Sequence, residues 1–96
     1  MRIDTNLVCE IWSHFGITDR ADEFYGDSSE EPFVTARAVF SHMSYEARVP
    51  VSVIADYLHS NVSTTYSRIK SIRAKIERKD SDILNAIVCI RENLLK

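Results

Sequence analysis

Apolar residues recur along this chain every three or four positions, the spacing that gathers them on one face of an α-helix. No segment alternates apolar and polar residues over several positions, so the pattern predicts no strand. The spacing predicts about six helices, over residues 5–15, 18–25, 32–48, 51–58, 63–79 and 81–94. The chain is therefore expected to fold as one all-α domain spanning residues 1–96, without internal repeats.

Residues that commonly begin or end helices support these boundaries. Short polar side chains able to cap a first turn precede four of the helices: Asp4 or Thr5, Thr18, Ser63, and Asp80 or Ser81. Gly16 stands where a glycine commonly ends a helix. Pro32 suits the first turn of the third helix, which Val49-Pro50 ends.

The two longest predicted helices each combine an apolar face with a polar one. In helix 32–48 the residues expected to face the core are Phe33, Ala36, Phe40, Met43 and Ala47, and the polar stripe is Arg37, Ser41, Ser44 and Arg48. In helix 63–79 the apolar stripe is Tyr66, Ile69, Ile72 and Ile76, and the polar face carries Thr64, Ser67, Arg68, Ser71 and Lys75. The polar faces are where a partner would be bound.

The composition excludes several classes of function. The hydrophobic fraction of 45% and charged fraction of 27% are ordinary for a soluble domain, and no apolar run or signal peptide indicates a membrane or secreted protein, so a cytoplasmic location is expected. Cys9 and Cys89 stand alone and are expected to be reduced core thiols. His14, His42 and His59 lack metal-ligand spacing, and no motif would activate a nucleophile. We expect neither catalysis nor a metal or cofactor.

The net charge of −2 conceals an asymmetry along the chain. Residues 1–32 carry two basic and eight acidic side chains, whereas residues 33–96 carry ten basic and six acidic ones. Within residues 62–80 six basic side chains face only two acidic ones, so the positive surplus of the second part can be assigned to one helix. A basic helix on an otherwise acidic protein indicates polyanion binding, although a solvated helix face has the same pattern.

Residues 51–79 have the pattern of a helix-turn-helix, whose second helix would enter the major groove of DNA. Ala55 is small enough to let the second helix cross the first closely, and Asn61 is the turn residue best suited to a left-handed backbone conformation. The second helix begins with polar side chains that can meet phosphates or bases, namely Ser63, Thr64, Thr65, Ser67 and Arg68. A capped amphipathic helix that faces only water remains the alternative.

Four short segments carry a resemblance to a known family. Residues 8–18 end in Phe-Gly-Ile-Thr, residues 34–39 read Val-Thr-Ala-Arg-Ala-Val, residues 54–55 read Ile-Ala, and residues 63–65 read Ser-Thr-Thr. In this order and spacing they resemble the C-terminal DNA-binding domain of the bacterial replication initiator DnaA, a Trp-repressor-like helix-turn-helix domain. The resemblance implies binding of short DNA boxes at replication origins, with Thr64, Thr65 and Arg37 as DNA contacts.

The chain also departs from the family's pattern. Val62-Ser63 replaces the signature Asp-His, Asn61 replaces a basic turn residue, and the acidic residues 27–31 replace a basic segment. These departures imply a less strict preference for DNA sequence, and a weaker affinity for DNA, than the family has. The family's ATPase module is absent from these 96 residues, so the chain is either a stand-alone relative or a fragment of a longer protein, and the first is expected.

The sequence therefore predicts binding of double-stranded DNA. The candidate contact residues are Arg37, Arg48, Asn61, Ser63, Thr64, Thr65, Ser67, Arg68, Lys70 and Lys75. The alternatives are a protein-interaction module that uses the acidic region 19–31, and a small transcription regulator acting as a homodimer.

Overall fold

Helices make up most of the protein in the computed structural model, which describes residues 2–26 and 28–95. The elements are α1 (Thr5–Phe15), η1 (Thr18–Phe24), α2 (Phe33–Glu46), α3 (Val51–Tyr57), α4 (Val62–Glu77) and α5 (Ser81–Leu94). The described residues contain no strand, and η1 is a 3-10 helix with a kink at Arg20. The prediction of an all-α fold with about six helices is confirmed.

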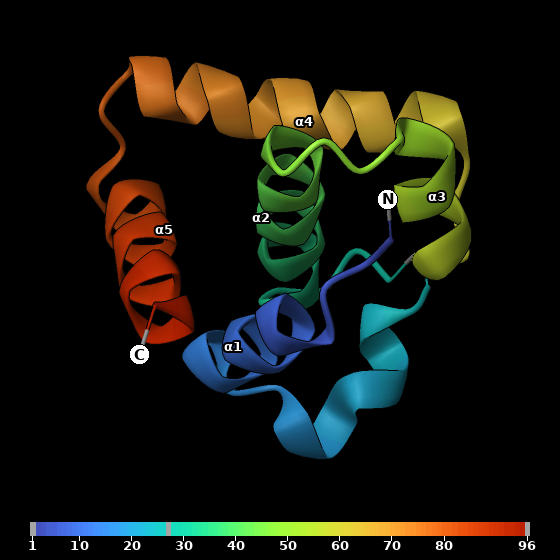
Figure 1. Ribbon diagram of the computed structural model, residues 1–96, viewed down its shortest axis with the longest axis horizontal. Helices are drawn as coiled ribbons and strands as arrows, with labels where there is room; N and C mark the ends of the chain where they lie inside the picture. The colour runs from blue at the N-terminus through green and yellow to red at the C-terminus, as the bar shows by residue number, and fades with distance from the viewer. Residues whose placement is uncertain (1, 27, 96) are drawn as a thin grey trace.

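The central element is α2, which runs through the middle of the molecule, with α4 lying across it, α1 beyond its other end, and α3 and α5 on opposite sides (Figure 1). Its burial is not confined to one face, because Phe33 and Phe40 are fully enclosed and so are Arg37 and Ser41. The predicted polar stripe is therefore wrong for Arg37, Ser41 and Ser44, which are all buried. Because every other element contacts α2, only Val34 and Glu46 among its described residues are exposed.

Arg37 is a structural residue of this core. Its side chain is 1% exposed, and the guanidinium donates to the backbone carbonyls of Glu23, Phe24 and Ser28, with the Nε–Phe24 O distance 2.9 Å. These carbonyls lie in η1 and in the segment after it, where few backbone partners are available. Arg37 thus holds η1 and Ser28 against α2 and is turned away from solvent.

The helix ends follow the capping rules at two of the four predicted N-termini. The Asp4 carboxylate accepts from the Asn6 amide at 2.9 Å, and the Asp80 carboxylate accepts from the amides of Asp82 and Ile83. Gly16 has φ 67° and ends α1 as predicted. The prediction that Thr18 caps a helix is wrong, because Ile17 occupies the cap position of η1 and no side chain caps it.

A cluster of aromatic rings joins η1 to α1, α2 and α3. Phe24 lies edge-on against Trp12, Tyr25 and Phe40, and Tyr25 stacks edge-on against Tyr57. The hydroxyls of Tyr25 and Tyr57 are 3.0 Å apart. Burial, and then the hydrogen bond to Tyr57, raise the pKa of Tyr25 above its ordinary value, so its hydroxyl stays neutral at physiological pH.

The two cysteines are not in the core. Cys9 on α1 and Cys89 on α5 are exposed free thiols, so the expectation of core thiols is wrong. In α1 the buried positions are Leu7, Val8 and Ile11, and Cys9 falls on the outer side of the helix. No helix within the described part of the chain combines the length and apolarity needed to cross a bilayer.

The buried His42 on α2 makes the stability of the fold depend on pH. Its side chain is 4% exposed, and its Nδ1 atom has no hydrogen-bond partner among the described residues. Burial lowers the pKa of His42 from its ordinary 6.5, with Arg73 and Arg91 acting in the same direction and Glu46 against it. The unfolded chain therefore takes up a proton near pH 6.5 that the folded chain resists, so the free energy of unfolding falls as the pH drops below that value.

We expect urea unfolding to show lower stability at about pH 5.5 than at about pH 7.5, and His42→Gln to reduce that difference. The exposed His14 provides the control, since His14→Gln should leave the pH dependence unchanged. Equal pH dependence in wild type and His42→Gln would show that His42 does not carry the effect.

Candidate nucleic-acid interface

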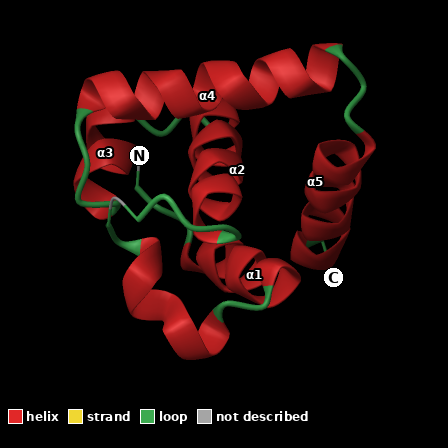
Figure 2. Cartoon of the chain, turned by 180° about the vertical axis from the view of Figure 1, so that it is seen from behind, coloured by secondary structure: helices red, strands yellow, loops and turns green. Residues whose placement is uncertain are grey.

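The α4 helix forms one edge of the molecule, and in opposite views no other element covers its outer side (Figures 1 and 2). Its inner side carries Thr65, Ile69 and Ile72, which are buried against the rest of the fold, together with the half-buried Ile76. The spacing of these residues is the one predicted for the apolar stripe of a helix. The opposite face of α4 is therefore free along its 16 residues.

The helix begins at an asparagine cap. The Asn61 carboxamide oxygen accepts from the Thr64 amide at 2.8 Å, so the prediction that Ser63 is the cap is wrong. The helix starts one residue earlier than predicted, which makes Ser63 an exposed first-turn residue. The left-handed turn residue is His59, at φ 54°, whereas Asn61 has φ −119°, so the turn conformation predicted for Asn61 is also wrong.

The outer face of α4 is lined by small residues. Ser63, Ser67, Ser71 and Ala74 are all exposed and recur every three or four positions, which places them along one line on the helix. The exposed cations Lys70 and Arg78 flank this line. Because short side chains keep little distance between a helix backbone and its partner, this face can approach another surface closely. We call it the outer face of α4.

Three of the predicted contact residues are not displayed on this face. Thr65 is fully buried and its hydroxyl donates to the Asn61 carbonyl at 2.9 Å, and Arg37 is enclosed in the core. Both side chains are thus buried in this structure and are not displayed to a partner at the surface. Lys75 is half-buried and lines a hollow with Phe15 and Asp80, away from the line of serines.

The remaining predicted residues are accessible to different degrees. Asn61, Ser63, Ser67 and Lys70 are exposed, and Thr64 is half-buried beside them. Arg68 is half-buried, and its Nη1 atom has no solvent exposure. Arg48 is exposed just beyond the end of α2, at φ 69°. Exposed residues of this set thus concentrate around the first two turns of α4.

Several exposed residues of α4 were not predicted. Tyr66 is 46% exposed, so its assignment to the apolar stripe is wrong, and Val62 is 43% exposed. Steps of about 100° per residue put Tyr66 about 90° from the centre of the isoleucine stripe, a signal available in the sequence. Arg73 lies over the Tyr45 ring with its Cζ atom 5.2 Å from the centroid, and pairs with Glu46 at 3.5 Å.

The acidic part of the chain lies on the other side of the molecule. In both views η1 is at the edge opposite α4 (Figures 1 and 2). Within that part, Arg20 pairs with Glu23 at 2.6 Å and with Glu30 at 3.5 Å, which compensates two of the acids. Asp27, part of the acidic region 19–31, lies outside the described residues. The acidic residues of η1 thus lie away from α4, whereas Glu31 lines the same hollow as Lys75 and Glu46 pairs with Arg73.

Comparison with protein-family models, with curated proteins and with solved structures finds no match to this chain. Among residues 2–26 and 28–95, the His, Cys, Asp and Glu side chains form no group of three or more that could hold a metal ion.

Proposed function

We propose that this protein binds double-stranded DNA, with α3 and α4 acting as a helix-turn-helix and the outer face of α4 lying in the major groove. The single observation that carries the proposal is the uncovered outer face of α4, which combines a line of small residues with cations and has no acidic residue in its first turn. The major groove, about 12 Å wide, admits one α-helix, and a helix lined by short side chains enters it most deeply.

The contacts follow from the chemistry of the exposed groups. The hydroxyls of Ser63 and Ser67 and the amides of the first turn of α4 donate to phosphate oxygens or base edges. Lys70 and Arg78 neutralise phosphates on either side of the groove, and Arg48 approaches the adjacent backbone. Attraction to phosphates of this kind makes binding strongly dependent on salt.

The separation of charge supports one orientation on the duplex. The basic helix α4 and the acidic element η1 lie at opposite edges of the molecule (Figure 1). A duplex at the outer face of α4 is therefore kept away from most of the acidic side chains. The repulsion that the sequence predicts from its acidic region weakens with distance and is screened by salt, over about 8–10 Å at physiological ionic strength.

Sequence preference is expected to be relaxed relative to the DnaA family. Of the three contacts that the resemblance implies, Arg37 and Thr65 are buried, which leaves Thr64. At the position of the signature aspartate the chain has Val62, whose exposed apolar side chain suits contact with a thymine methyl group. The result is binding governed mainly by phosphates.

The experiment is fluorescence anisotropy with a random duplex and a DnaA-box duplex, each at low and moderate salt. We expect binding to both duplexes, an affinity that falls steeply with salt, and a small preference between the two sequences. A replication role gains support from a preference for the box.

Absence of binding to either duplex at low salt would overturn the proposal. It would favour the alternative, a protein-interaction module on the same scaffold that uses the acidic region 19–31. Asp19 and Asp22 are exposed there and belong to no ion pair among the described residues, so they are the residues to reverse in that case. Mass measurement in solution tests the homodimer alternative.

A further inference from the structure

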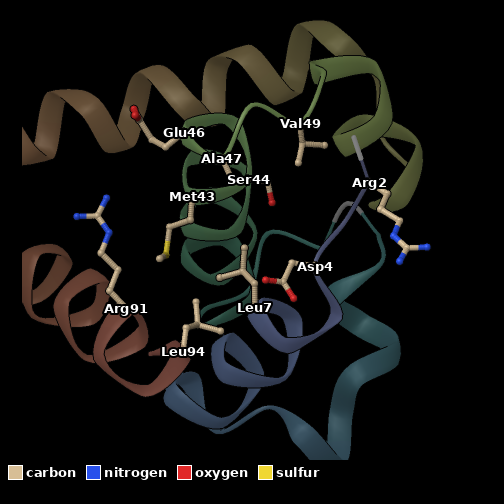
Figure 3. A pocket seen from close by; sticks show the side chains of 10 residues that line it. All are labelled: Arg2, Asp4, Leu7, Met43, Ser44, Glu46, Ala47, Val49, Arg91 and Leu94. Atoms are coloured by element: carbon tan, nitrogen blue, oxygen red, sulfur yellow. The ribbon is translucent and has the colours of Figure 1, made fainter. Parts of the chain in front are cut away.

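One hollow away from α4 lies between α1, α2 and α5, with a volume of about 350 Å³ (Figure 3). Its walls are mainly apolar, and the side chains that form them are Leu7, Met43, Ala47, Val49 and Leu94. Charged residues stand at its margin, namely Arg2, Asp4, Glu46 and Arg91. We call it the α1–α2–α5 hollow.

A buried polar atom without a partner points into this hollow. Ser44 is 1% exposed, and its Oγ atom has no hydrogen-bond partner among the described residues. The hydroxyl is directed toward the space between Leu7 and Val49 (Figure 3). Leaving a buried hydroxyl without a partner is unfavourable, so a ligand group that accepts its proton would stabilise the complex.

The charged residues at the margin differ in whether they already have a hydrogen-bond or ion-pair partner. The Asp4 carboxylate caps α1, and Glu46 pairs with Arg73 at 3.5 Å. No ion pair among residues 2–26 and 28–95 involves Arg91, which is exposed at the edge of the hollow. Capping leaves the negative charge on Asp4, but neither Arg2 nor Arg91 belongs to an ion pair among the described residues, so Arg91 is open to a ligand carboxylate.

We propose that the α1–α2–α5 hollow binds a small amphiphilic carboxylate. The carboxylate pairs with the Arg91 guanidinium at the edge, the apolar body lies along Met43, Leu7 and Leu94, and a hydroxyl or carbonyl at the far end accepts from Ser44 Oγ. The hollow is large enough for a small ligand of this kind. This site is independent of DNA binding and involves no residue of the outer face of α4.

The test uses three probes of equal chain length in amide-resolved NMR titrations of the full chain. Hexan-1-ol has the apolar body and the hydroxyl, hexanoate has the apolar body and the carboxylate, and 6-hydroxyhexanoate has both polar ends. We expect amide shifts in α1, α2 and α5, with 6-hydroxyhexanoate bound more tightly than either of the other two probes. Each added group should improve affinity about tenfold, the factor that corresponds to about 1.4 kcal/mol.

Two variants test which residue of the hollow binds the hydroxyl of the ligand and which binds its carboxylate. Ser44→Ala should remove the difference between the two carboxylates without lowering stability, since it deletes an unsatisfied hydroxyl. Arg91→Gln should remove the difference between 6-hydroxyhexanoate and hexan-1-ol, which differ only by the carboxylate. The matched controls Ser13→Ala and Arg78→Gln change exposed residues outside the hollow and should leave all three affinities unchanged.

Three outcomes would overturn the proposal. They are the absence of shifts with every probe at about 10 mM, equal affinities for hexan-1-ol and 6-hydroxyhexanoate in the wild type, and an unchanged preference between the two carboxylates in Ser44→Ala.

Discussion

The substitution Ser67→Glu is expected to lower the affinity for duplex DNA about 100-fold while leaving the fold intact. Ser67 is exposed in the second turn of α4, midway between the first-turn serine and Ser71 on the outer face. A carboxylate there would face the phosphates that line the groove, and like charges brought together at an interface cost several kcal/mol. Glutamate favours helix at least as well as serine, so no loss of stability accompanies the change.

Matched variants separate the charge from the size of the new side chain and from its position. Ser67→Gln has the same shape without the charge and should weaken binding less than Ser67→Glu. Ser13→Glu adds the same charge on the exposed side of α1 and should alter affinity little. The measurements are anisotropy at low salt and thermal unfolding of each variant. If Ser67→Glu bound DNA as tightly as Ser13→Glu, the outer face of α4 would not be the interface.

Arg37→Met is expected to destabilise the protein by about 3–5 kcal/mol, because it removes several hydrogen bonds from a charged donor, each worth about 1.5–3 kcal/mol. Methionine fills most of the space but donates no hydrogen bond, so the carbonyls of Glu23, Phe24 and Ser28 lose the donor that Arg37 supplies. A domain of this size has about 5–15 kcal/mol of stability in total, so the loss is a large part of it. Urea unfolding measures it.

The control for this prediction is Arg48→Met, because Arg48 is exposed just beyond the end of α2 and should be nearly neutral for stability. The resemblance to DnaA instead implies that Arg37 contacts DNA. A stable Arg37→Met protein with weakened DNA binding would support that implication and contradict the structural role.

The sequence predicts most of the helices because their apolar spacing reflects burial against a single surface. For α1 the residues Leu7, Val8 and Ile11 are buried as the spacing requires, and the Asp4 and Asp80 caps are local features that need no tertiary information. The same local reasoning misplaced the cap of α4, since both Asn61 and Ser63 are good capping residues and only the backbone decides between them.

The failures in α2 share one physical cause. Periodicity identifies which face of a helix is apolar, but it cannot identify a helix that is buried around most of its circumference. Arg37 and Ser41 look like solvent-facing residues until the carbonyls that they contact are known: Arg37 donates to Phe24 O, and Ser41 donates to Arg37 O at 2.8 Å. Those contacts come from tertiary packing and from the path of η1, whose irregular 3-10 geometry has no periodic signal.

Because α2 is central, it tolerates fewer substitutions than the outer face of α4 does. Substitutions in α2 disturb contacts with all the other elements, so this helix has little freedom to vary. The outer face of α4 contributes almost nothing to the core, and its serines can be replaced without an energetic penalty on folding. Evolution can therefore alter the outer face of α4 while the scaffold that presents it stays the same.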